Sequence, residues 1–281
     1  MILNLVATLL SGIQDMGTSM TPNSQSTLID VYWRPKNLKT NCPNCGESKY
    51  KKLSSKEGEQ IVKCDCGVVY KNIVRRDIIR HYGNPHIWDN PFFKERYKKI
   101  SKYLAEKVKK PELIIDIGCA DGRMLEQLHN CFSDSILYGV EPSKPLHASL
   151  NNYNFKINVI KSSFDDCEIK EKFDLVVCMG VDYLFVDHNK GMIKLLNILK
   201  STGHLYIERN VFYDMQSFVG KKIKNIDDMF WTNRLITTWY TVKQMETQLE
   251  KHFEIKDKLI YGEEYSKQVG WLCVSKNNTN R

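Results

Sequence analysis

Four cysteines near the start of the chain lie at spacings that bring thiolates together. Cys42 and Cys45 flank a Pro-Asn turn, and Cys64 and Cys66 flank an aspartate further along. Four thiolates at two such turns can form a closed tetrahedral zinc site, with a β-hairpin between the pairs and a glycine after each pair to let the backbone wrap the metal. The second pair is C-x-C, where C-x-x-C is usual. A metal-free hairpin and, less favoured, a redox pair are therefore the alternatives.

A second group of residues suits the binding of a nucleoside. The run Ile114–Gly122 reads I-I-D-I-G-C-A-D-G, a short apolar strand that ends in a glycine turn. Gly118 permits a tight turn and the close approach of a ligand, and Gly122 lets the next helix pack near the strand. Ala120 stands where a third glycine is common, and its methyl group is tolerated if the local φ is negative.

An acidic residue after the next apolar run completes this pattern. Glu141 follows Gly139 and Val140, about twenty residues beyond the glycine turn, where a carboxylate can accept both hydroxyls of a ribose. The turn spacing is G-x-A-x-G, which disfavours a nicotinamide dinucleotide, since its fingerprint is G-x-G-x-x-G. An ordinary strand–helix turn is the alternative, and the combination of the turn with Glu141 disfavours it.

The elements that must position these residues alternate along the chain after Pro111. Apolar runs predict strands at Leu113–Ile117, Ile136–Glu141, Ile157–Ile160, Phe173–Met179 and His204–Glu208, and the segments between them predict helices at Arg123–His129, Pro145–Asn151 and Lys190–Leu199. This alternation indicates a parallel sheet with helices on both faces. A helix over Val242–His252 and strands over Phe253–Tyr261 and Val269–Ser275 then predict an antiparallel pair at the sheet edge.

Four segments divide the chain. Residues 1–32 are expected to be a disordered leader, 33–72 the zinc-ribbon-like cysteine module, 73–110 a helical connector and cap, and 111–281 the α/β domain. In the connector, Asn90 and Pro91 suit a helix start, and apolar residues recur at helical spacing from Phe93 to Val108. No apolar run is long enough to cross a bilayer, so no membrane association is expected.

The composition indicates the size of the fold, the cellular location and the charge of the substrate. The chain has 281 residues with 42% apolar residues, enough for one large α/β domain and a small module. Its nine cysteines are an odd number without a secretory signal, which indicates reduced thiols and a cytoplasmic location. The net charge of +8 is spread along the chain, which suits an anionic substrate or a nucleic acid, or reflects solubility alone.

From Leu113 onward the sequence resembles class I S-adenosylmethionine-dependent methyltransferases. The resemblance rests on I-I-D-I-G-C-A-D-G, Y-G-V-E-P-S, S-S-F-D-D, F-D-L-V-V-C-M-G-V-D-Y-L, L-K-S-T-G-H-L-Y-I-E and the tail W-Y-T-V-K-Q-M-E-T-Q-L-E-K-H-F-E-I. It covers about Ile73 to Ser275 and implies a Rossmann-like seven-stranded sheet. The order of cysteine ribbon, linker and this domain is similar to bacterial sugar and natural-product methyltransferases, and also to a ribosomal-RNA guanine methyltransferase with a zinc ribbon.

The resemblance assigns roles to residues of this chain. The methionine part of S-adenosylmethionine would lie by the glycine turn, the ribose at Glu141, the adenine near Phe164, and the end of the fourth strand beneath the cofactor. The cofactor-binding residues so implied are Asp116, Gly118, Cys119, Ala120, Gly122, Glu141, Pro142, Ser163, Phe164, Asp165, Met179 and Gly180.

The chain departs from the family after the fourth strand. Many relatives have Leu-Glu-His there, whereas this chain has Val181, Asp182 and Tyr183. A methyl transfer needs alignment, plus a base when the acceptor is a hydroxyl. The candidates for a catalytic role are His188, Tyr183, Asp182 and His81. Aromatic residues of the connector and of the segment after the fifth strand, Trp239 and Tyr240 among them, are expected to cap the cofactor or to form the core of that cap.

Three functions fit these observations. The favoured one is methyl transfer to a small-molecule or glycan-precursor acceptor. The alternative is an RNA methyltransferase whose ribbon presents lysines to phosphates, namely Lys49, Lys51, Lys52, Lys56, Lys63 and Lys71. A binding protein that keeps the fold without catalysis is the third. The sequence fixes neither the acceptor nor the oligomeric state.

Overall fold

The computed structural model describes residues 38–39, 41–56, 59–74, 91–185, 187–211, 238–263 and 266–276. The predicted leader lies outside these residues, and so do His81 and most of the predicted aromatic cap. In the part of the chain that is described, no helix is both long and apolar enough to cross a membrane.

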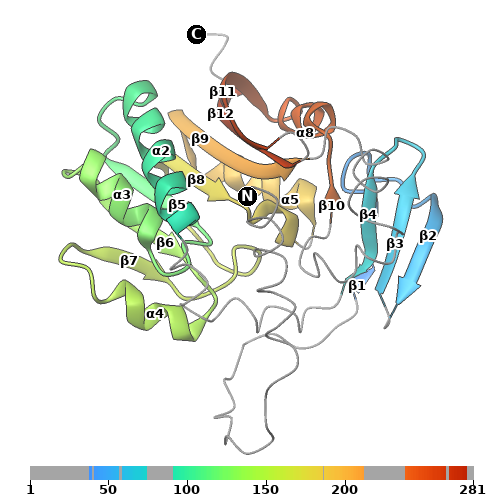
Figure 1. The fold of residues 1–281 in the computed structure, drawn as a ribbon, viewed down its shortest axis with the longest axis horizontal. Coiled ribbons are helices and arrows are strands. Elements are labelled where there is room, and N and C mark those ends of the chain that lie inside the picture. Colours follow the sequence, from blue (N-terminus) through green and yellow to red (C-terminus); the bar gives the residue numbers. More distant parts are fainter. Residues whose placement is uncertain are drawn as a thin grey trace, which may run out of the picture.

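Seven strands form the main sheet, in the order β11-β12-β9-β8-β5-β6-β7 (Figure 1). The parallel strands are β5 (Leu113–Ile117), β6 (Ile136–Val140), β7 (Ile157–Ile160), β8 (Phe173–Met179) and β9 (Leu199–Val211). The last two, β11 (Phe253–Glu263) and β12 (Ser266–Ser275), are antiparallel, and β12 lies between β11 and β9. The predicted seven-stranded sheet with an antiparallel edge is confirmed.

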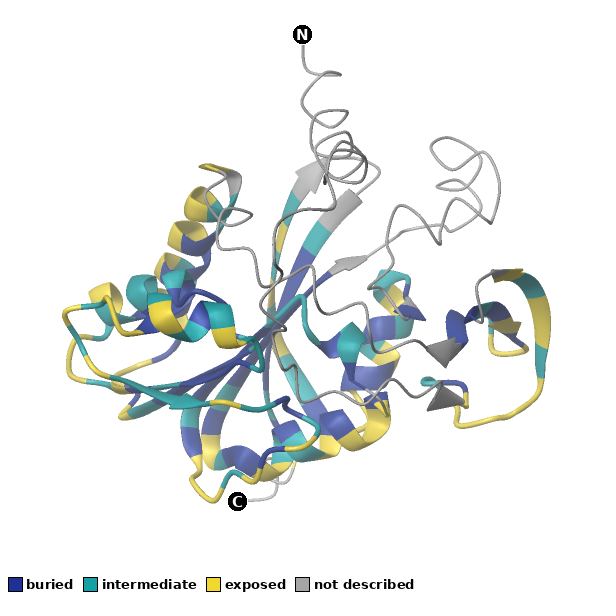
Figure 2. Ribbon diagram, turned by 90° about the horizontal axis from the view of Figure 1, so that it is seen from below, coloured by how far each residue is buried: buried dark blue, intermediate teal, exposed yellow. Residues whose placement is uncertain are grey.

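Helices cover both faces of this sheet, as predicted. They are α2 (Pro91–Lys107), α3 (Arg123–Cys131), α4 (Lys144–Leu150), α5 (His188–Ile198) and α8 (Val242–Leu249), and a 3-10 turn, η4, spans Asp182–Leu184. Alternate residues of β8 point to opposite faces: Leu175 and Val177 join the core under α2 and α3, while Val176 and Cys178 join the core under α5 and α8. Figure 2 shows the resulting buried centre between exposed outer helix faces.

The cysteine module forms a second, smaller sheet. Its strands are β1 (Leu38–Lys39), β2 (Tyr50–Lys56), β3 (Glu59–Cys64) and β4 (Val69–Val74), and β2 and β3 are the predicted hairpin. The module also takes a strand from the distant part of the chain, because β10 (Thr238–Trp239) pairs antiparallel with β4. This pairing was not predicted from the sequence.

The module and the α/β domain share one apolar core. Val62 and Tyr70 of the module belong to the same buried cluster as Tyr240, Met245 and Leu249 around α8. The Gln248 side chain of α8 also donates a hydrogen bond of 2.7 Å to the backbone oxygen of Asn44. The module is therefore anchored to α8 by apolar packing and a hydrogen bond, and to β10 by strand pairing.

Candidate active site

A cavity of about 260 Å³ lies at the carboxyl ends of β5, β6 and β8. This is the edge at which open parallel sheets bind ligands. All of the predicted cofactor-binding residues except Gly122 line it, together with Tyr183 from the set of catalytic candidates. The remaining lining residues were not predicted from the sequence; they are Phe93, Arg96, Tyr97, Met124, Val140, Leu146, Val181, Leu184 and Phe185.

The turn after β5 is fastened to the end of β6. The backbone N–H groups of Gly118 and Cys119 both donate to the carbonyl oxygen of Val140, at 2.8 and 3.1 Å. Gly118 has φ of +74°, and a Cβ atom there would lie 2.5 Å from Cγ2 of Val181. Glycine is required at this position both by the left-handed backbone and by the close neighbour.

Ala120 does not meet the condition under which the sequence pattern tolerates its methyl group. That condition was a negative φ, whereas the φ of Ala120 is +49°, in the left-handed region. The conformation directs the backbone N–H of Ala120 to Oε2 of Glu141 at 3.0 Å. This bond to a carboxylate offsets part of the cost of a left-handed alanine, which is about 1–2 kcal/mol.

Gly122 allows close packing between the start of α3 and the region around α4. It precedes α3 with φ of +89°, and it does not border the cavity. An added Cβ atom would lie 2.6 Å from Leu150 and 2.8 Å from Tyr153. The close approach at Gly122 is thus to the α4 region, whereas the sequence pattern had suggested packing of α3 on its strand.

Two buried carboxyl groups face the cavity. Glu141 accepts backbone hydrogen bonds on both oxygens, from Ala120 at 3.0 Å and from Ser143 at 2.7 Å. Burial raises the pKa of Glu141 to about 7, even though these two bonds act to lower it. Burial, and then the nearby charge of Glu141, raise the pKa of Asp116 to about 8. The site thus favours a ligand that carries positive charge and hydroxyl donors.

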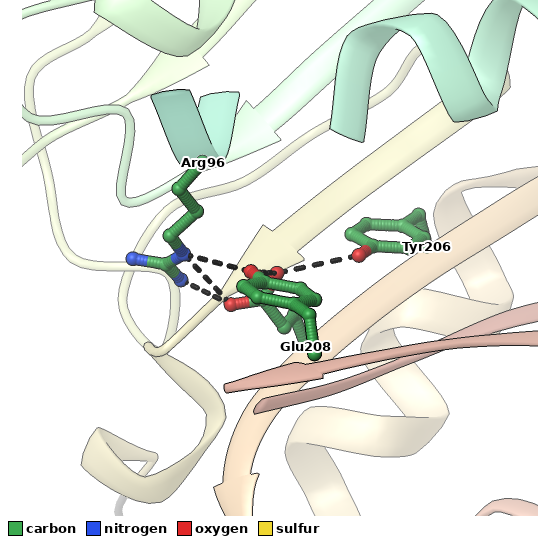
Figure 3. Close-up of polar contacts among 4 residues, drawn as sticks. Arg96, Tyr206 and Glu208 are labelled. Atoms are coloured by element: carbon green, nitrogen blue, oxygen red, sulfur yellow. Dashed lines mark hydrogen bonds and ion pairs between the residues drawn. The ribbon is translucent and has the colours of Figure 1, made fainter. Parts of the chain in front are cut away.

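Arg96 of α2 is the only cationic side chain among the described residues that line the cavity. Its guanidinium pairs with the fully buried carboxylate of Glu208 on β9, with Nε 2.8 Å from Oε1 (Figure 3). The hydroxyls of Tyr261 and Tyr206 donate to the other carboxylate oxygen at 2.6 and 3.3 Å. Burial acts to lower the pKa of Arg96, but the charge of Glu208 outweighs it and the pKa lies above the ordinary value. This network fixes α2 over the end of the sheet.

The loop after β7 forms another wall, with Ser163, Phe164 and Asp165 lining the cavity. Within the loop, the Ser163 hydroxyl donates to the carboxylate of Asp166 at 2.6 Å. From α5, the Lys194 ammonium donates to the backbone oxygens of Phe164 and Cys167. Helix α5 thus holds this loop at the wall of the cavity.

The turn after β8 separates the catalytic candidates into two groups. Tyr183 lines the cavity, together with Met179 and Gly180. Asp182 and His188 do not line it and instead bond to each other, with 3.1 Å between Oδ2 and Nε2. Burial lowers the pKa of His188, which keeps its ring neutral.

Arg209 completes the Asp182 pair from β9. Its Nε lies 3.0 Å from Oδ2 of Asp182. Burial acts to raise the pKa of Asp182, but the charge of Arg209 and the bond to His188 outweigh it and the pKa lies below the ordinary value. Asp182 is therefore ionised and paired.

Residues 91–252 match the model of a family that is described as a methyltransferase domain. The chain belongs to this methyltransferase family. A curated relative, the carboxy-S-adenosyl-L-methionine synthase of Campylobacter concisus, is 28% identical over 131 residues, which are 44% of this chain and 56% of that protein. The match thus spans little more than half the length of this relative.

Solved structures resemble the methyltransferase domain in fold. The plantazolicin methyltransferase BpumL, in complex with a pentazolic desmethylPZN analog and SAH, has a TM-score of 0.53 at 18% identity, over 72% of this chain and 91% of that chain. The N-methyltransferase NodS from Bradyrhizobium japonicum, in complex with S-adenosyl-L-homocysteine, has a TM-score of 0.54 at 15% identity, over 72% and 97%. A complex between the Haloferax volcanii Trm112 methyltransferase activator and the putative methyltransferase has a TM-score of 0.54 at 14% identity, over 71% and 98%. The predicted methyltransferase fold is confirmed.

Beside the methyltransferase domain, the four cysteines of the module converge. The sulfur atoms of Cys42, Cys45, Cys64 and Cys66 all lie within 4.8 Å of one another, with 3.6 Å from Cys42 to Cys66 and 3.5 Å from Cys45 to Cys64. Four thiolates around a tetrahedral zinc ion lie about 3.8 Å apart, given Zn–S bonds of about 2.3 Å. The donor set and its spacing therefore fit a zinc ion, and the C-x-C half contributes both of its sulfurs.

Proposed function

We propose that this protein transfers a methyl group from S-adenosylmethionine to a small-molecule or glycan-precursor acceptor. The observation that carries the proposal is the cavity at the strand ends, where Asp116 and Glu141 meet beside the glycine turn. The names of the related proteins support it, since BpumL and NodS were solved with S-adenosylhomocysteine and the curated relative is named for a carboxylated S-adenosylmethionine.

Each wall of the cavity suits one part of that ligand. Glu141 accepts from the ribose hydroxyls, with its oxygens already oriented by two backbone N–H groups. Asp116 attracts the ammonium of the methionine part, and Arg96 attracts its carboxylate. The loop around Phe164 encloses the adenine. When bound, S-adenosylmethionine supplies a methyl group on a positively charged sulfur, and the chain's task is to align that group with the acceptor.

The ribbon gives limited support to an RNA acceptor. Lys71, one of the lysines expected to face phosphates, is instead buried against Glu59 at 3.2 Å. BpumL is named for plantazolicin and NodS for N-methylation, and neither name refers to RNA. An acceptor of small-molecule type is therefore the favoured proposal. Binding to RNA that falls steeply with added salt would support the alternative.

Of the catalytic candidates, we propose Tyr183 as the residue that contacts the acceptor, because it alone among the described candidates borders the cavity. Asp182 and His188 are proposed to act as a buried pair that positions Arg209. His81 stays a sequence-based prediction, since it lies outside the described residues.

The proposed cofactor is tested by calorimetry with S-adenosylhomocysteine. Glu141→Gln removes the charge and one of the two acceptors, so the affinity should fall about 10- to 100-fold, as expected for a hydrogen bond to a charged group. Glu126→Gln is the matched control, because Glu126 lies on α3 outside the cavity. Wild-type protein that fails to bind, or equal affinities for wild type and Glu141→Gln, would contradict the proposal.

We also propose that the cysteine module holds a structural zinc ion. A module of this size has little core of its own, so the metal would contribute to its stability. Metal analysis of purified protein should find about one zinc per chain. The variant Cys45→Ser should lose the zinc ion. The variant Cys131→Ser is the control and should keep it, because Cys131 is also exposed but lies outside the cluster. Wild-type protein without zinc would refute the site.

A further inference from the structure

One edge of a buried guanidinium lacks a partner at the carboxyl end of β9. Arg209 is only 2% exposed. Its Nε pairs with Asp182, at 3.2 Å from Oδ1 and 3.0 Å from Oδ2. Its two terminal nitrogens, Nη1 and Nη2, have no hydrogen-bond partner among the described residues. Buried donors are costly unless something accepts from them, so these two nitrogens require an explanation.

The Arg209 side chain lies next to a residue that lines the proposed methyl-donor site. The Arg209 guanidinium is 5.8 Å from the ring centroid of Tyr183, which lines the cavity. The turn after β8 is bonded to the same strand, because the N–H of Gly180 donates to the oxygen of Glu208 at 2.8 Å. Arg209 and the cavity are therefore held together by one turn and one strand end.

Tyr240 provides the second polar group. Its ring lies 4.6 Å from the Arg209 guanidinium, and its hydroxyl also lacks a partner among the described residues. Tyr240 follows directly on β10, the strand that pairs with β4 of the cysteine module. The module thus helps to hold one wall of this polar site.

The chemistry of the free edge restricts what it can bind. A guanidinium has only donors, so the partner must present acceptors, and two parallel N–H groups match the two oxygens of a carboxylate or phosphate. Asp182 already engages the opposite edge, and His188, which faces Asp182, is buried and neutral.

We propose that Arg209 and Tyr240 bind an oxyanion group, a carboxylate or a phosphate, on the methyl acceptor. The inference rests on the proposed function, because it names a chemical group of the acceptor in that reaction. It makes Arg209 a residue that selects anionic acceptors over neutral ones of the same shape.

The test uses three small probes: acetate, inorganic phosphate and acetamide, the neutral isostere of acetate. Each is titrated into protein saturated with S-adenosylhomocysteine, and the side-chain ¹⁵N–¹H resonances of Arg209 are followed by NMR. At least one anion should shift these resonances, and acetamide should bind about tenfold more weakly or worse. The preference between acetate and phosphate identifies the oxyanion.

Variants separate this inference from the proposed function. Arg209→Gln should weaken anion binding about tenfold or more, measured from the probe's own resonances. Lys200→Gln should leave anion binding unchanged, because Lys200 pairs with Asp174 at the opposite end of the same strand. If Arg209→Gln folds poorly because Asp182 loses its partner, the double variant Asp182→Asn/Arg209→Gln is used in its place, since it removes both charges.

The outcomes are distinct. If acetamide binds as well as the anions, if no anion binds, or if Arg209→Gln binds them as tightly as wild type, the oxyanion site is refuted while binding of S-adenosylhomocysteine stands. If S-adenosylhomocysteine does not bind, the proposed function fails, and the same titration on free protein still decides the role of Arg209.

Discussion

Binding of S-adenosylmethionine should release protons, because two carboxyl groups in the cavity hold protons that the ligand displaces. The pKa of Asp116 is about 8 and the pKa of Glu141 is about 7, both raised mainly by burial. At pH 7 these values make Asp116 about nine-tenths protonated and Glu141 about half protonated. An ammonium beside Asp116 and ribose hydroxyls on Glu141 both favour the ionised forms. Binding at pH 7 should therefore release about one proton or slightly more, and almost none well above pH 8.

Calorimetry in buffers with different ionisation enthalpies measures this number directly. The observed binding enthalpy at pH 7 should vary linearly with the buffer's ionisation enthalpy, and the slope gives the protons released. Affinity should rise from pH 6 to pH 8, since protons are lost on binding. Asp116→Asn keeps the size of the side chain and removes one titrating group, so its slope should be less than half that of wild type. A wild-type slope of zero would refute the assignment of both carboxyl groups to the ligand.

Three further predictions concern the free protein. In the folded protein the pKa of Asp116 is raised to about 8, above its unfolded value of about 3.9. Its contribution to stability is therefore complete below about pH 3.9 and is lost as pH rises through about 8. The melting temperature of wild type relative to Asp116→Asn should fall between about pH 5 and about pH 9. Ala120→Gly should raise the free energy of unfolding by about 0.5–1 kcal/mol in urea titrations, because glycine relieves the left-handed φ at some entropic cost, and a destabilised variant would contradict this. Gly139→Ala should lower it by about 1–3 kcal/mol, since the new Cβ atom would lie 2.5 Å from the Cys119 sulfur; unchanged stability would show that the turn gives way freely.

The sheet was predictable because its central strands are buried on both faces. Such strands appear as apolar runs, and the central strands Leu113–Ile117 and Phe173–Met179 have the bounds expected from the sequence. Ile157–Ile160, at the edge of the sheet, also has the expected bounds. β9 was predicted too short, as His204–Glu208. The strand begins at Leu199, and the residues from Lys200 to Gly203 are polar or small, so no apolar run marks this part of it.

The cavity residues that follow from the order of the strands could be predicted, whereas those that depend on helix packing could not. The carboxyl ends of parallel strands meet at one edge, so Asp116 and Glu141 could be placed together from sequence alone. Arg96 could not be placed there, because the sequence does not indicate which face of the helix covers that edge. The one available signal was its position between Phe93 and Tyr97 in a helical pattern. Nor could the φ of Ala120 be inferred, since it depends on a bond to a carboxylate that lies distant in sequence.

The pairing of β10 with β4 sets an order of assembly during synthesis. The edge of β4 that β10 covers belongs to an early segment, while Thr238 and Trp239 emerge from the ribosome only after most of the α/β domain. Until then, the backbone groups of that edge are open to pairing with other chains, a recognised route to aggregation. The two segments are joined by contacts of long sequence separation, which form late and slowly. The small sheet can therefore be completed only after the chain has been made as far as Trp239, before α8, β11 and β12 have been added.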